Sequence, residues 1–67
     1  MKAGVRNQFT GEITEIKLGT IMAEVVLKAG DNEVTSVMTI DSVKEAGFEV
    51  GQKATALIKA INVVLVK

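Results

Sequence analysis

The residues best suited to chemistry lie in one nine-residue stretch, TIDSVKEAG, at positions 39–47. Apolar and polar residues alternate up to Ile40, which is typical of a strand, and Ser42 and Glu45 then have the spacing of a helix capping box. Asp41 is a competing cap one residue earlier. Gly47, the last residue of the stretch, is well placed to end the helix in a left-handed conformation. A helix start exposes unpaired N–H groups at its positive end, so this junction outlines an oxyanion pocket. The alternative, that Asp41 and Ser42 only cap a connecting helix, is favoured by these residues alone.

Side chains that could hold a small oxyanion also occur near other expected strand ends. The hydroxyl and cationic candidates are Arg6, Thr39, Ser42 and Lys59. Composition alone does not bring them together. The chain has no His and no Cys, which excludes a Ser-His triad, a thiolate nucleophile and an ordinary zinc or copper site. No Gly-rich phosphate loop is present either. Because all these catalytic and metal-binding patterns are missing, we expect a binding protein with no metal and no enzymatic activity.

The charge balance gives no reason to expect a nucleic-acid or membrane partner. Lys and Arg total 8, and Asp and Glu total 8, so the formal net charge is zero. Single-stranded nucleic acid is bound by aromatic platforms in a basic groove, but Phe9 and Phe48 are the only aromatic residues and both are expected in the core. No apolar run approaches 18 residues and no signal core follows Met1, so a cytoplasmic protein is expected.

The elements that must position these residues are mostly strands. Alternating apolar residues and Gly-containing turns predict five strands, at residues 9–18, 20–29, 33–40, 53–60 and 63–66. One short helix lies between the third and fourth strands. This order predicts an all-β fold, a five-stranded OB-fold-like Greek-key barrel, with residues 1–67 forming a single domain.

The hydrophobic content is high for so short a chain. Hydrophobic residues make up 48% of 67 residues, mostly Val, Ile, Ala and Leu. A domain of this size buries only about 60% of its unfolded surface. Some apolar strand surface must therefore meet other subunits, and we expect a homo-oligomer.

Four segments in order resemble one known family. The opening Val5-Arg6-Asn7-Gln8-Phe9-x-Gly11 resembles the Arg-Asn-Gln-Leu-x-Gly start of the molbindin (Mop) domains, small molybdate- and tungstate-binding proteins. Residues 19–25, 39–43 and 50–60 are similar to that family's second strand, strand-to-helix junction and fourth strand. The resemblance therefore covers the whole chain.

The resemblance implies a homohexamer, a trimer of dimers, with molybdate or tungstate bound between subunits and no covalent cofactor. One wall of the implied site is Arg6 with Lys59 and Ala60, and the other is Thr39, Ile40 and Ser42 of a neighbouring subunit. Backbone amides such as those of Arg6, Ile40 and Ala60 are expected to contribute donors. The family's second class of site, near its three-fold axes, has no residues assigned here.

The family usually has Ser two residues before the Arg, where this chain has Gly4. One lost hydrogen bond to a charged ligand costs about 1.5–3 kcal/mol, although water can replace part of it. The leading hypothesis is storage and homeostasis of molybdenum, with binding that varies little through neutral pH because no His is involved. A second hypothesis is an assembly module with a degenerate anion site, and a third is a single-strand nucleic-acid-binding OB domain.

Overall fold

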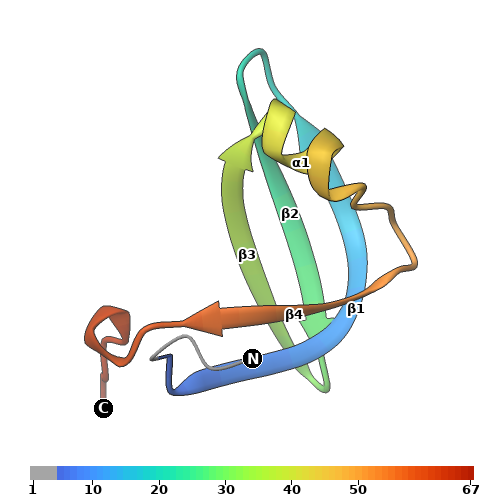
Figure 1. Ribbon diagram of the computed structural model, residues 1–67. Coiled ribbons are helices and arrows are strands. Elements are labelled where there is room, and N and C mark those ends of the chain that lie inside the picture. The colour runs from blue at the N-terminus through green and yellow to red at the C-terminus, as the bar shows by residue number, and fades with distance from the viewer. Residues whose placement is uncertain (1–4) are drawn as a thin grey trace.

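The computed structural model describes residues 5–67, which form one curled antiparallel sheet in the strand order β3-β2-β1-β4 (Figure 1). The elements are β1 (Asn7–Leu18), β2 (Met22–Ala29), β3 (Asn32–Thr39), α1 (Ile40–Ala46), β4 (Lys53–Ile58) and the 3-10 helix η1 (Ala60–Asn62). The expected strand-helix-strand order is confirmed. Among residues 5–67, no helix has the length and apolarity needed to cross a membrane.

The long strand β1 belongs to two parts of the sheet. Its first half pairs with β4 and its second half with β2, and Glu12 faces Lys53 on one side and Lys28 on the other. A β-bulge between Ile13 and Glu15 bends the strand at this point. A Cβ atom on Gly11 would collide with the Lys28 carbonyl oxygen, so only glycine allows the close approach. The bend turns β4 across the direction of β2 and β3, as Figure 1 shows.

The core lies inside this curl. Its buried members are Ile13, Ala23, Val25, Leu27 and Val43. Three of them, Ala23, Val25 and Leu27, alternate along β2 and share its inner face. Ile21 continues this alternation in the sequence but is 71% exposed, because β2 begins only after it. Val43 is the one buried residue of α1, and together with half-buried Ile40 it packs the helix against one end of the curl.

The helix begins earlier than the sequence suggested. Its N-cap is Thr39, whose hydroxyl accepts a hydrogen bond from the Ser42 N–H at 3.1 Å. The prediction of Ser42 or Asp41 as the cap was therefore wrong. The helix follows β3 directly, with no intervening loop. Its first residue, Ile40, is half-buried and packs against the core. The predicted left-handed helix end at Gly47 is confirmed, with φ 71°.

The predicted fifth strand is absent from the described residues, so the fold is an OB-like half-barrel of four strands. β4 ends at Ile58, two residues before the predicted end, and the 3-10 turn η1 follows. Val63 donates to the Ala60 carbonyl at 3.2 Å, and the chain then runs away from the sheet (Figure 1). Pattern alone predicted a strand at residues 63–66, but a strand needs a neighbour. The single chain supplies none there.

Candidate functional site

Arg6 and Lys59 lie at the open end of the β1–β4 ribbon. The last pair of that ladder is Asn7 with Ile58, so Arg6 immediately precedes it and Lys59 immediately follows it. Lys59 has extended backbone angles, φ −64° and ψ 137°, and both side chains are exposed. The two ion pairs of residues 5–67 join Lys17 to Glu15 and to Glu24, so neither of the two ribbon cations is neutralised by a described carboxylate. The pairing of β1 with β4 therefore places two positive charges at the same end of the molecule.

Thr39 and Ser42 form a hydroxyl pair at the start of α1. The Thr39 hydroxyl donates to Ser42 Oγ at 2.8 Å while accepting from the Ser42 N–H. Each hydroxyl has one proton, so the Thr39 proton is already engaged and that of Ser42 remains able to donate outward. Both residues are exposed. Ser42 is thus the hydroxyl of this pair best arranged to bind an anion.

The two other expected residues contribute differently. The Ile40 N–H donates to the Ile21 carbonyl at 2.8 Å, so in this conformation it is engaged within the chain. Ala60 is the first residue of η1, where an N–H has no intrahelical partner. Gly4, the position where the family usually has Ser, lies outside the described residues.

One chain does not bring the two groups together. Figure 1 shows α1 at one end of the molecule, and the end of β4 with the start of β1 at another. The principal extents are 34 × 28 × 22 Å, whereas a tetrahedral oxyanion needs all its donors within hydrogen-bond distance. A site that uses both groups therefore requires a second copy of the chain.

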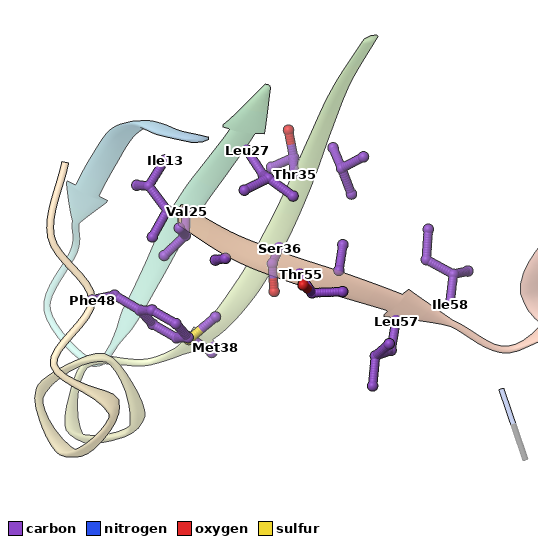
Figure 2. A pocket seen from close by; sticks show the side chains of 13 residues that line it. Ile13, Val25, Leu27, Thr35, Ser36, Met38, Phe48, Thr55, Leu57 and Ile58 are labelled. Atoms are coloured by element: carbon purple, nitrogen blue, oxygen red, sulfur yellow. The ribbon is translucent and has the colours of Figure 1, made fainter. Parts of the chain in front are cut away.

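An apolar groove, which the sequence did not reveal, lies between the unpaired edges of β3 and β4. Its volume is about 410 Å³, and Figure 2 shows Phe48 and Met38 toward one end and Ile58 toward the other. None of its lining residues is charged, so the groove does not suit an oxyanion. Half-buried Phe48 packs against the core as predicted, whereas the prediction that Phe9 lies in the core was wrong, because its side chain is 39% exposed. No local signal marked the groove, because the sequence pattern predicted a fifth strand at residues 63–66, and only the structure shows that the described residues leave the inner face of the sheet uncovered.

The profile of the TOBE domain family matches residues 4–65. The chain belongs to the TOBE domain family. It is 44% identical over 66 residues to Molybdenum-pterin-binding protein 1 of Clostridium pasteurianum, covering 97% of each chain. A molybdate-binding protein from Sporomusa ovata is 37% identical and superposes with a TM-score of 0.93 over 100% of both chains. These findings confirm the family resemblance read from the sequence.

A third relative is longer than this chain. The cytoplasmic molybdate-binding protein ModG, solved with molybdate bound, is 38% identical with a TM-score of 0.89. The match covers 96% of this chain and 46% of that one. By their names these relatives are binding proteins rather than enzymes.

Proposed function

We propose that this protein binds molybdate, or the chemically similar tungstate, between subunits of a cytoplasmic homo-oligomer and serves molybdenum storage and homeostasis. The observation that carries the proposal is the Thr39–Ser42 hydroxyl pair with an outward donor, in a chain whose relatives are named for molybdenum or molybdate binding. A tetrahedral dianion needs donors and positive charge, and it needs neither a resident metal nor a covalent cofactor.

The donor set divides between two subunits. Arg6 and Lys59 of one copy supply charge, and the Ala60 N–H beside them adds a backbone donor. Ser42 of the neighbouring copy donates its hydroxyl proton, held in place by Thr39. Hydrogen bonds to an ionised ligand are roughly twice as strong as neutral ones, so a few such contacts suffice for specific binding.

The exposed C-terminal tail supports assembly. Val63, Val64, Leu65 and Val66 are 45%, 83%, 89% and 92% exposed, an arrangement that water disfavours. The apolar groove between β3 and β4 offers two unpaired strand edges and an uncharged lining. The tail of a second copy can add to these edges as a strand, with alternate side chains in the groove. We take the homohexamer, a trimer of dimers, as the expected assembly.

Two measurements test this proposal. Isothermal titration with molybdate, tungstate and sulfate should give heat for the two heavy oxyanions, and none at millimolar concentration would defeat the proposed ligand. Light scattering should give a mass several times that of one 7.1 kDa chain, and a monomer at micromolar concentration would defeat the shared site. An oligomer without heat would favour the second hypothesis, an assembly module with a degenerate site.

A further inference from the structure

Asn7 differs from its neighbours at the open end of the β1–β4 ribbon. It is half-buried, while Arg6 and Gln8 on either side are exposed. Its side-chain amide, Nδ2, donates to the Ile58 carbonyl oxygen at 3.3 Å, joining residues 51 apart in sequence. A carbonyl oxygen has two lone pairs, so it can accept this bond in addition to any ladder bond. Asn7 therefore ties the first residue of β1 to the last residue of β4.

This tie lies where the ribbon needs it. Beyond the Asn7–Ile58 pair the ladder ends, and after Lys59 the chain turns into η1. The residues next in line are Arg6 and Lys59, whose like charges repel each other and favour separation of the strand ends. An apolar side chain at position 7 could pack against the ribbon, but it could not donate a hydrogen bond to the Ile58 carbonyl oxygen.

We propose that Asn7 is a positioning residue that holds Arg6 and Lys59 side by side, so that both cations reach the same oxyanion. The inference rests on the proposed function for its consequence, but its structural part is independent of any ligand. One further step of the same register would bring Arg6 opposite Lys59, and directly opposite residues in an antiparallel pair have Cα atoms about 4.5–5.5 Å apart. That spacing lies within the roughly 4.4–6.8 Å that a disulfide tolerates.

The absence of cysteine allows a clean test. The double variant Arg6→Cys/Lys59→Cys should form an intrachain disulfide readily, and adding Asn7→Leu should slow that oxidation by about fivefold, the equivalent of one net hydrogen bond. The control pair is Thr10→Cys/Thr55→Cys, placed on the same ribbon where the two hydroxyls are 2.9 Å apart. Asn7→Leu should leave its oxidation rate within about twofold, since a net bond is lost only at the end of the ribbon.

If Asn7 only stabilises the fold as a whole, Asn7→Leu should slow the oxidation of both cysteine pairs alike. If Asn7 has no role, the substitution should slow the oxidation of neither pair. Either outcome overturns the inference. The second arm is titration of the single variants with molybdate. Asn7→Leu should weaken affinity about fivefold, while the matched change Gln8→Leu should leave it unchanged. Wild-type affinity in Asn7→Leu would also overturn the inference. If the wild-type protein gives no heat, the proposed function fails, and the disulfide rates still decide whether Asn7 positions the two residues.

Discussion

Ser42→Ala separates ligand binding from helix capping. The Thr39 hydroxyl accepts the Ser42 backbone N–H, and this bond survives when the Ser42 side chain is removed. The helix therefore keeps its cap. The variant loses only Ser42 Oγ, whose hydroxyl proton we propose is donated to the oxyanion.

The expected magnitudes differ clearly. A hydrogen bond to a charged group contributes about 1.5–3 kcal/mol, so affinity for molybdate should fall roughly 10- to 150-fold. Ser42 is exposed, and water can replace it as the partner of the Thr39 hydroxyl, so the free energy of unfolding should change by less than about 0.5 kcal/mol. Thr39→Val is the contrasting variant, because it removes the cap and should cost about 1 kcal/mol of stability as well as affinity.

The assay is titration calorimetry with molybdate on all three proteins, paired with urea unfolding of the same preparations. Ser42→Ala should reduce affinity at unchanged stability, and Thr39→Val should reduce both. Wild-type affinity in Ser42→Ala would refute the role of this hydroxyl. A loss of stability as large as that of Thr39→Val would refute the assignment of Thr39 as the cap.

Three further variants test the rest of the structure. Gly11→Ala places a Cβ atom against the Lys28 carbonyl oxygen, so the free energy of unfolding measured with urea should fall by about 1–3 kcal/mol or more. An unchanged free energy would contradict the close approach of the two strands. Leu65→Lys changes a side chain that is 89% exposed in one chain, so the mass in light scattering should decrease while the fold by circular dichroism is kept; an unchanged mass would exclude the tail from the interface. Asp41→Asn removes an exposed negative charge next to Ser42, and molybdate affinity should rise by up to about fivefold at low salt, less at high salt; affinity independent of Asp41 would place the ligand elsewhere.

The strands that pair within the chain were predictable because their signals are local. Successive residues of β2 point to opposite faces, and the apolar residues at every second position, Ala23, Val25 and Leu27, form the core face, a spacing that is visible in the sequence. The left-handed conformation at Gly47 follows in the same way from a residue without a Cβ atom.

The candidate site was only partly predictable. Residue types alone identified Arg6, Thr39, Ser42 and Lys59 as donors, whereas Ile40 and Ala60 came only from the family resemblance. Neither reading revealed that the Ile40 N–H is engaged by the Ile21 carbonyl. Nor could either show that Thr39 caps α1 in place of the predicted Ser42 or Asp41, because the cap depends on where β3 stops pairing with β2.

The sequence by itself determined a β-rich chain with too much apolar surface for its size, a helix after the third strand, and a set of oxyanion donors without metal ligands. The tertiary structure decided the number of strands, since residues 63–66 find no neighbour within one chain. It also decided that the cationic and hydroxyl groups lie at different ends of the molecule. Both differences have one physical reason: a strand and a binding site are each defined by contacts between distant segments, and local pattern records only which residues are able to make them.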